Sequence, residues 1–311
     1  MISRRAFNKY LATTTALTLT GLDGQARPSN IFKKAIPSSG VAIPAIGMGT
    51  WITFDLDMPD SGYMEHISIL DAFFKAGGSM IDSSPMYGSA QKNLGITLPK
   101  SQGHQQLMSA TKIWIPGKDN GIQQMDLAAK LWGIPQFDLI YVHNMLDWEN
   151  HLPTLNQWKQ EGTLKYTGLT TSHGRRHKAL SDVMRSETLD FVQFSYNLHD
   201  RDAEKRLLPL AQDKGIAVVI NRPFQTGGLF TRVGNKPLPD WAIEIECNSW
   251  SQFFLKFIIS HPAVTCVIPA TSQVLHMQEN MRALRGTLPD AKMREEMIRY
   301  YESITSSNTA K

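Results

Sequence analysis

The chain has 311 residues, a formal net charge of +4 and 42 % hydrophobic residues. A charge this small argues against a protein whose main partner is a nucleic acid. The one dense basic run, Arg175 to Lys178, is expected to be the solvated start of a helix rather than a phosphate site. Only two cysteines occur, Cys247 and Cys266, and no His and Cys spacing typical of a metal site is present. A disulfide is possible in an oxidising compartment, but a core of this size does not require one.

The first residues carry the pattern of an export signal. Arg4, Arg5 and Lys9 precede a mildly apolar stretch over residues 11–22 that is interrupted by threonines. This stretch is too short and too polar to span a bilayer. The segment SRRAFNK resembles the bacterial twin-arginine motif, which addresses folded proteins for export. We therefore predict a twin-arginine signal peptide over residues 1–26, with Ala26 as a candidate cleavage position, and a periplasmic mature protein. The alternative is an N-terminus that carries two arginines by chance.

Residues 27–311 alternate between short apolar runs and longer segments of helical period. The run IGMGTW starts at Ile46, a helical segment covers Met64–Ala76, and the run SMID ends at Asp82. Along the whole chain there are eight strand signals, ending near residues 51, 82, 112, 143, 170, 195, 221 and 270. Eight strand–helix units in one domain are typical of a parallel (β/α)8 TIM barrel. We predict this fold for residues 27–311, with a short N-terminal hairpin closing the bottom of the barrel.

A doubly wound open sheet is the competing architecture. Such a sheet normally carries a Gly-x-Gly-x-x-Gly motif after its first strand. The segment GMGTW lacks the third glycine, and no helical segment follows it directly. The barrel is therefore favoured, and its functional residues should lie at the carboxyl ends of the strands, where the loops converge.

Four titratable side chains stand at the ends of three consecutive predicted strands. Asp82 ends the second strand, Tyr87 follows in the next loop, Lys112 ends the third strand and His143 ends the fourth. Each has an ordinary structural explanation by itself, such as a turn cap or a buried histidine. Together they form a proton-donating unit, because a phenol with a pKa of about 10 is a poor acid until a cation stabilises its anion. We predict that Lys112 lowers the pKa of Tyr87 against the cost of desolvation, that Asp82 holds Lys112, and that neutral His143 orients a substrate oxygen.

These segments resemble the aldo-keto reductase family over the whole chain after the signal. The family's tetrad of Asp, Tyr, Lys and His falls on Asp82, Tyr87, Lys112 and His143 without a substitution. The resemblance implies a barrel that binds an extended nicotinamide dinucleotide and reduces an aldehyde or ketone by hydride transfer, with Tyr87 as the general acid. The matching segments are, in chain order, IPAIGMGTW, AFFKAGGSMIDSSPMYGSAQKNLG, TKIW, FDLIYVHNM, LKYTGLTTSH, FVQFSYNLHD and IPATSQVLHMQENMRAL.

The resemblance also implies a set of cofactor-binding positions. Gln193 matches the residue that contacts the nicotinamide amide, and the loop from Gly227 to Leu229 matches the one that approaches the pyrophosphate. Thr171 stands where many members have an asparagine, and Asn221 where many stack a tyrosine on the nicotinamide ring. The expected cofactor-binding residues are Gln193, Thr170, Thr171, Asn221, Gly227, Leu229, Thr271 and, near the adenine, Glu279 and Asn280.

The choice between NADP(H) and NAD(H) depends on the segment after the last predicted strand. Many family members place a lysine or arginine there against the extra phosphate of NADP, but residues 270–276 contain neither. The resemblance implies NADP(H), with Thr271, Ser272 and His276 as substitute contacts. NAD(H) is the alternative cofactor.

Aromatic and thioether side chains adjoin the predicted catalytic strand ends. Trp51, Met86 and Trp114 are the expected substrate contacts, with Met145 and Phe224 nearby. Such a lining favours an apolar or aromatic carbonyl substrate. The alternative function is a non-catalytic barrel that binds a cofactor or a partner protein, because two nicotinamide positions are altered. The expected partners are the small-molecule carbonyl substrate and the twin-arginine export machinery. We expect a monomer by default, no nucleic-acid partner and no stable membrane insertion.

Overall fold

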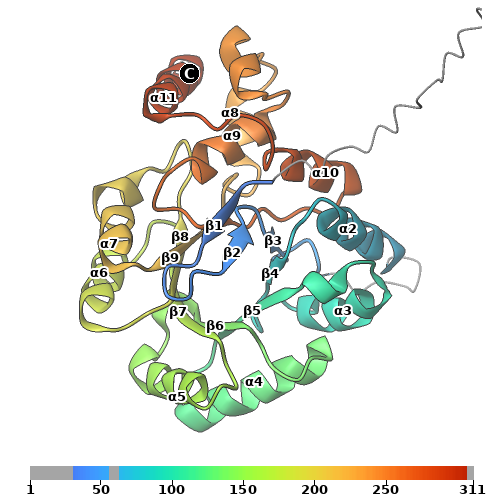
Figure 1. Ribbon diagram of the computed structural model, residues 1–311, viewed down its shortest axis with the longest axis vertical. Helices are drawn as coiled ribbons and strands as arrows, with labels where there is room; N and C mark the ends of the chain where they lie inside the picture. Colours follow the sequence, from blue (N-terminus) through green and yellow to red (C-terminus); the bar gives the residue numbers. More distant parts are fainter. Residues whose placement is uncertain (1–30, 56–62, 307–311) are drawn as a thin grey trace, which may run out of the picture. The chain divides into compact units, whose positions relative to one another are not determined.

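The computed structural model describes residues 31–55 and 63–306. The predicted signal peptide therefore lies outside the described residues. Eight parallel strands form the main sheet, hydrogen-bonded in chain order from β3 to β10. Parallel bridges from Ile46 to Val267 and from Gly49 to Ala270 join the first strand to the last and close the barrel (Figure 1). The strands are β3 (Met48–Gly49), β4 (Met80–Asp82), β5 (Met108–Ile113), β6 (Leu139–Val142), β7 (Tyr166–Thr170), β8 (Phe191–Ser195), β9 (Ala217–Asn221) and β10 (Cys266–Val267).

Helices surround this barrel, so the predicted (β/α)8 fold is confirmed and the open sheet is excluded. Periodicity predicts helical segments over residues 64–76, 90–98, 152–161, 178–185, 204–214, 249–259 and 274–284, and α4, α8 and α11 are not among them. The helices are α2 (Tyr63–Lys75), α3 (Ala90–Thr97), α4 (Lys118–Trp132), α5 (Trp148–Gln160), α6 (His177–Ser186), α7 (Leu207–Lys214), α8 (Gly228–Val233), α9 (Trp250–Ile259), α10 (Val274–Arg282) and α11 (Ala291–Thr305). Short 3-10 turns are η2 (Leu98–Lys100), η3 (His104–Gln106), η4 (His143–Met145), η5 (Asp202–Lys205) and η6 (Asp240–Ile245).

A two-stranded antiparallel hairpin precedes the barrel, as predicted. It pairs β1 (Lys33–Ala35) with β2 (Ala42–Pro44). Ile36 and Ile43 of this hairpin belong to the same buried cluster as Met80 and Met108, the first residues of β4 and β5. The hairpin therefore covers the amino-terminal end of the barrel, and the carboxyl-terminal end is left for a binding site.

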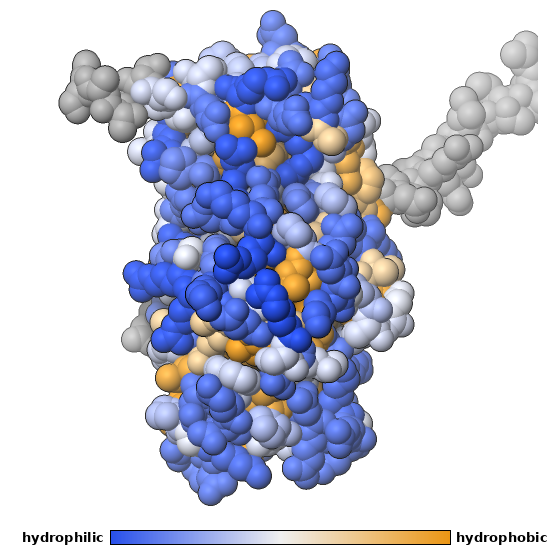
Figure 2. Space-filling model, turned by 90° about the vertical axis from the view of Figure 1, so that its left-hand side faces the viewer, coloured by the Kyte–Doolittle hydropathy of each residue, from blue (hydrophilic) through white to orange (hydrophobic). Residues whose placement is uncertain are grey.

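The barrel has one apolar core inside the sheet and a larger one between the sheet and the helices. There are two cores because successive side chains of a strand point to opposite faces of the sheet. In β8, Phe191 belongs to the inner cluster, whereas Val192 and Phe194 belong to the outer one. The outer cluster is completed by the apolar faces of the helices. The opposite faces of these helices are polar, and Figure 2 shows small, separate hydrophobic areas within a mostly hydrophilic surface on the side that carries α6 and α7.

The same alternation places polar residues at the carboxyl-terminal end of the barrel interior. On five strands, an apolar residue of the inner cluster is followed two positions later by a polar or charged one. Burying such groups is costly unless they are hydrogen-bonded, so each polar residue of this top layer needs a partner. The five polar residues are Asp82, Lys112, His143, Gln193 and Asn221.

Neither cysteine is in a disulfide. Cys247 and Cys266 are free and buried, and burial raises the pKa of each thiol to about 12. Within residues 31–55 and 63–306, no group of three His, Cys, Asp or Glu side chains is placed to hold a metal ion. No helix in this described part of the chain is long and apolar enough to cross a membrane.

Candidate active site

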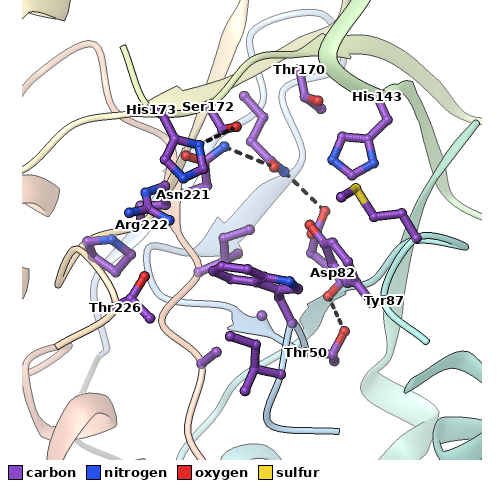
Figure 3. A pocket seen from close by; sticks show the side chains of 18 of the residues that line it. Thr50, Asp82, Tyr87, His143, Thr170, Ser172, His173, Asn221, Arg222 and Thr226 are labelled. Carbon is purple, nitrogen blue, oxygen red and sulfur yellow. Dashed lines mark hydrogen bonds between the residues drawn. The ribbon is translucent and has the colours of Figure 1, made fainter. Parts of the chain in front are cut away.

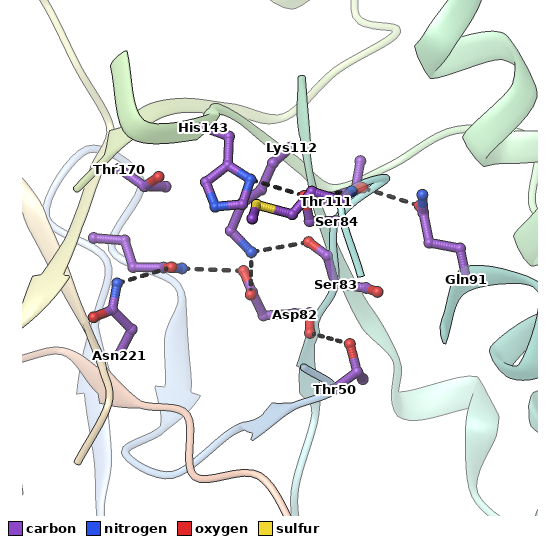
Figure 4. A network of polar contacts seen from close by, with 12 residues as sticks. Thr50, Asp82, Ser83, Ser84, Gln91, Thr111, Lys112, His143, Thr170 and Asn221 are labelled. Carbon is purple, nitrogen blue, oxygen red and sulfur yellow. Dashed lines mark hydrogen bonds and ion pairs between the residues drawn. The ribbon is translucent and has the colours of Figure 1, made fainter. Parts of the chain in front are cut away.

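Lys112 and Asp82 form a buried ion pair at the top of the barrel. The lysine side chain is 0 % exposed, and its Nζ contacts Oδ1 of Asp82 and donates a hydrogen bond of 2.9 Å to the carbonyl oxygen of Ser83 (Figure 4). Burial by itself lowers the pKa of Lys112, but the Asp82 carboxylate and Tyr87 outweigh it and raise the pKa above its usual value. Lys112 is therefore a permanent positive charge at neutral pH, held in place by Asp82 as predicted.

Tyr87 lies directly beside this ammonium group. Lys112 Nζ is 4.8 Å from the centroid of the Tyr87 ring, and the tyrosine backbone N–H closes a turn onto Ser84 with a hydrogen bond of 3.0 Å. Burial raises the pKa of the phenol, Lys112 opposes this effect and Asp82 adds to it, so the net pKa lies above 10. The prediction of a lowered pKa is wrong in its net direction, because desolvation exceeds the attraction of Lys112. Tyr87 is thus a protonated phenol at neutral pH, with a cation beside the anion it forms on giving up its proton.

His143 is neutral, as predicted, and its orientation is set by Ser84. Its Nδ1 is 2.8 Å from Oγ of Ser84, which also accepts a hydrogen bond of 3.3 Å from the Met86 N–H. Burial, and secondly the charge of Lys112, lower the pKa of His143 to about 2. The ring meets Tyr87 edge-on with 5.8 Å between centroids. A neutral imidazole beside the phenol can hydrogen-bond a substrate oxygen without adding a second positive charge.

Gln193 and Asn221 extend the polar network across the barrel. Gln193 donates from Nε2 to Oδ2 of Asp82 at 3.0 Å, and its Oε1 accepts a bond of 3.3 Å from Asn221 Nδ2. Asn221 is itself held by the Thr171 carbonyl oxygen at 2.9 Å and by the Ser195 hydroxyl at 2.7 Å. The residue expected to contact a nicotinamide amide is therefore also a direct partner of the catalytic ion pair.

A cavity of about 450 Å³ opens above this network (Figure 3). Its floor and walls come from the ends of several strands, as expected for a barrel of this type. Lys112 lies beneath the floor and does not line the cavity. The predicted residues that line it are Asp82, Tyr87, His143, Thr170, Thr171, Gln193, Asn221, Gly227, Trp51 and Met86.

Several other predicted residues do not line this cavity. Leu229 is fully buried in the outer core, and the Thr271 hydroxyl accepts a hydrogen bond of 3.1 Å from the Gln273 N–H in a local turn. Glu279 and Asn280 belong to α10. None of these four residues lines the cavity. Trp114 lines a neighbouring cavity instead.

Residues that the sequence reasoning did not select complete the cavity wall. Arg222 follows the last residue of β9 in a left-handed conformation with φ of 51°, and its Cζ is 6.0 Å from the Trp51 ring centroid. Thr50 donates a hydrogen bond of 3.0 Å to the carbonyl oxygen of Asp82. The available signal was the position of Thr50 near the end of the first predicted strand and of Arg222 directly after the seventh. Other lining residues that were not selected from the sequence are Asn144, Ser172, His173, Arg175 and Thr226.

The chain belongs to the aldo/keto reductase family, whose model matches residues 45–296. Methylglyoxal reductase YeaE of Escherichia coli is 24 % identical over 267 residues, an alignment that covers 84 % of this chain and 93 % of the relative. Pyridoxal 4-dehydrogenase of Microbacterium luteolum is 22 % identical over 326 residues, covering 83 % of this chain and 94 % of the relative.

Solved structures share the barrel. The holo form of aldo-keto reductase AKR11C1 from Bacillus halodurans superposes with a TM-score of 0.72 at 18 % identity, covering 88 % of this chain and 96 % of the other. An aldo-keto reductase from Klebsiella pneumoniae, crystallised with NADPH, has a TM-score of 0.71 at 20 % identity, with coverages of 87 % and 96 %. At these identities the likeness establishes the fold, and the chemistry has to be argued from the site.

Proposed function

We propose that this protein is an exported oxidoreductase that reduces an aldehyde or ketone to an alcohol with a nicotinamide cofactor, NADP(H). The observation that carries the proposal is the contact of Tyr87 with Lys112 at the floor of the cavity, 4.8 Å from ammonium to ring centroid. A protonated phenol next to a buried cation is the arrangement required for general acid catalysis, because the cation stabilises the phenolate left after proton transfer.

The roles of the chain's residues follow from this geometry. When bound, the reduced nicotinamide supplies a hydride to the carbonyl carbon. Tyr87 gives its hydroxyl proton to the carbonyl oxygen, so that the C=O group becomes an alcohol. Lys112, fixed by Asp82, stabilises the phenolate until Tyr87 is reprotonated from solvent. Neutral His143 donates a hydrogen bond to the same oxygen and orients it.

The cavity wall fits a nicotinamide dinucleotide. Oγ1 of Thr171 is buried and has no hydrogen-bond partner among the described residues, so it can bond a carboxamide. Gly227 has φ of 86°. Apart from its two neighbours in the chain, no atom of the described residues lies within 4 Å of the position a Cβ would occupy, so a phosphate can approach the backbone there. Arg222 supplies positive charge for phosphates on the same wall. The structural relative crystallised with NADPH supports NADP(H), and NAD(H) remains the alternative that a direct assay distinguishes.

The rim of the cavity supports an apolar or aromatic carbonyl substrate. Trp51 and Met86 are large side chains with 40 % and 45 % of their surface exposed. Both side chains line the cavity, and an apolar and aromatic lining favours contact with an apolar ligand. Phe224 also lines the cavity, whereas Met145 is buried and does not.

Export in the folded state is consistent with the need for a cofactor made in the cytoplasm. A reductase that works in the periplasm has to bind its dinucleotide before it crosses the membrane. The test is mass spectrometry of small molecules released from protein purified out of the periplasm, combined with absorbance at 340 nm during reaction with a panel of aldehydes and ketones. Bound NADP(H) and aldehyde-dependent oxidation of NADPH are expected. No absorbance change with any carbonyl compound would instead favour a non-catalytic binding barrel.

A further inference from the structure

A second cavity adjoins the candidate active site. Its volume is about 210 Å³, and it shares four lining residues with the larger cavity, so the two spaces have a common wall. The shared residues are Asn144, Thr171, Ser172 and Arg175, and the second cavity is completed by Trp114 and Arg176.

The distinctive feature of the second cavity is its pair of arginines. Both belong to the basic run that the sequence places at the start of a helix, and α6 does begin at His177 with both arginines exposed. Arg176 is anchored, because its Nη1 donates a hydrogen bond of 2.8 Å to the Asn144 carbonyl oxygen. Arg175, by contrast, makes no ion pair within residues 31–55 and 63–306. Its guanidinium is therefore available to a ligand.

The charges around Arg175 do not cancel its own. Asp200 approaches the neighbouring Gly174 but forms no ion pair with either arginine within the described part of the chain. The pKa of His173 is lowered, first by burial and then by Arg222 and Arg175, so this histidine adds no charge at neutral pH. Of the described residues that line the second cavity, two carry guanidinium groups and none carries a carboxylate.

The second cavity is connected to the catalytic residues through Trp114. The Trp114 ring lies 5.1 Å from the His143 ring, centroid to centroid, and the same side chain lines the second cavity. Asn144, which follows His143 in the chain, lines both spaces. A substrate whose carbonyl oxygen lies at Tyr87 and His143 can thus extend along an aromatic wall toward Arg175.

We propose that the second cavity binds a carboxylate carried by the carbonyl substrate, so that the preferred substrates are apolar or aromatic aldehydes or ketones with a carboxylate group distant from the carbonyl. This assignment rests on the proposed reductase function. A free guanidinium presents a planar fork of donors that matches a carboxylate in a bidentate arrangement. One available arginine suits a single carboxylate better than a phosphate dianion.

The test compares three benzaldehydes that share the reacting aldehyde and ring and differ at the para position: 4-carboxybenzaldehyde, its methyl ester and benzaldehyde. For the unmodified protein we expect kcat/KM to be at least tenfold higher with the carboxylate than with either neutral compound, mainly through KM. Arg175→Gln should reduce this ratio about tenfold or more, because the carboxylate loses its charge-assisted hydrogen bonds. Arg175→Lys should retain part of the preference, because it keeps the charge but loses the fork. Arg185→Gln, at the other end of α6, is the matched control for loss of one charge.

A binding measurement separates failure of this inference from failure of the reductase assignment. Calorimetry with 4-(hydroxymethyl)benzoate and with the neutral 4-(hydroxymethyl)benzamide does not depend on turnover. Tighter binding of the benzoate that is lost in Arg175→Gln supports the carboxylate site even if no aldehyde is reduced. Equal binding of the two compounds, or equal effects of Arg175→Gln and Arg185→Gln on the substrate ratio, would overturn the proposal. Thermal unfolding of each variant confirms that it is folded.

Discussion

Gln193 donates a hydrogen bond of 3.0 Å to Oδ2 of Asp82, the carboxylate whose other oxygen contacts Lys112. This bond joins the wall expected to bind the nicotinamide to the ion pair expected to assist proton transfer. Replacement by Gln193→Leu removes it and leaves one oxygen of a buried carboxylate unsatisfied.

We expect Gln193→Leu to reduce the free energy of unfolding by about 1–3 kcal/mol, the usual cost of leaving a buried polar group unpaired. It should also lower kcat about tenfold, because Lys112 loses part of its positioning. Urea unfolding and 340 nm assays measure the two effects. Gln252→Leu, which removes another buried glutamine away from the cavity, is the control for stability alone. A variant with weakened nucleotide binding and unaltered kcat would show that Gln193 acts only on the cofactor.

The Tyr87 hydroxyl is expected to be the proton donor. Tyr87→Phe should lower turnover by about 10² or more, as loss of a positioned acid usually does. Nucleotide affinity should change little, because the ring is retained. Since the pKa of the phenol is raised above 10, reduction by the unmodified protein should persist to pH 10 before it falls. Steady-state rates across this pH range test both statements, and full activity in Tyr87→Phe would exclude the proposed role.

Lys112 is expected to be important for stability as well as for catalysis. Lys112→Met leaves the Asp82 carboxylate buried without its cation, which costs about 3–5 kcal/mol. The double variant Lys112→Met with Asp82→Leu should recover much of this loss, because no unpaired charge then remains. Chemical denaturation of the unmodified protein, Lys112→Met, Asp82→Leu and the double variant measures the coupling. Equal stability of the single and double variants would mean that the two side chains are not energetically paired.

The depressed pKa of His143 predicts a specific pH dependence of stability. In the unfolded chain this histidine binds a proton below about pH 6.5, whereas in the folded protein its pKa is about 2. The folded state therefore loses stability as the pH falls below 6.5, by up to about 1.4 kcal/mol per pH unit. Between pH 7 and pH 5 the unmodified protein should lose about 2 kcal/mol more than His143→Gln. Urea unfolding at the two pH values gives the comparison, and parallel losses in both proteins would contradict it.

The export prediction depends on the two arginines near the start of the chain. Conversion of Arg4 and Arg5 to lysine should leave the protein in the cytoplasm, because the twin-arginine receptor recognises the pair. Arg27→Lys, just after the predicted signal, is the matched control. Fractionation of cells followed by detection of the protein measures the outcome. Unchanged amounts in the periplasm would exclude this route.

Much of the site could be predicted before any tertiary structure was considered. In the segment FVQFS, the strict alternation of a strand places Phe191 and Gln193 on the same face, and the barrel places that face inside. The same reasoning brings Asp82, Lys112 and His143 to one end of the barrel. Residues beyond the strand ends were harder to predict, because loops follow no such period. Glu279 and Leu229 were expected at the cofactor but do not line the cavity, whereas Arg222 does.

The sequence by itself determined the fold class and the order of the strand ends, because periodicity and strand number are local properties that add along the chain. It also determined which polar residues lie together at one end of the barrel. Only the tertiary structure decided which hydrogen bonds they form and how deeply they are buried. The bond from Gln193 to Asp82 joins residues 111 positions apart, and the raised pKa of Tyr87 reflects a desolvation that depends on every neighbour packed around it. In the described part of the chain Arg175 makes no ion pair and lines a second cavity. Both features depend on which loops pack together, and a local pattern of residues does not specify that packing.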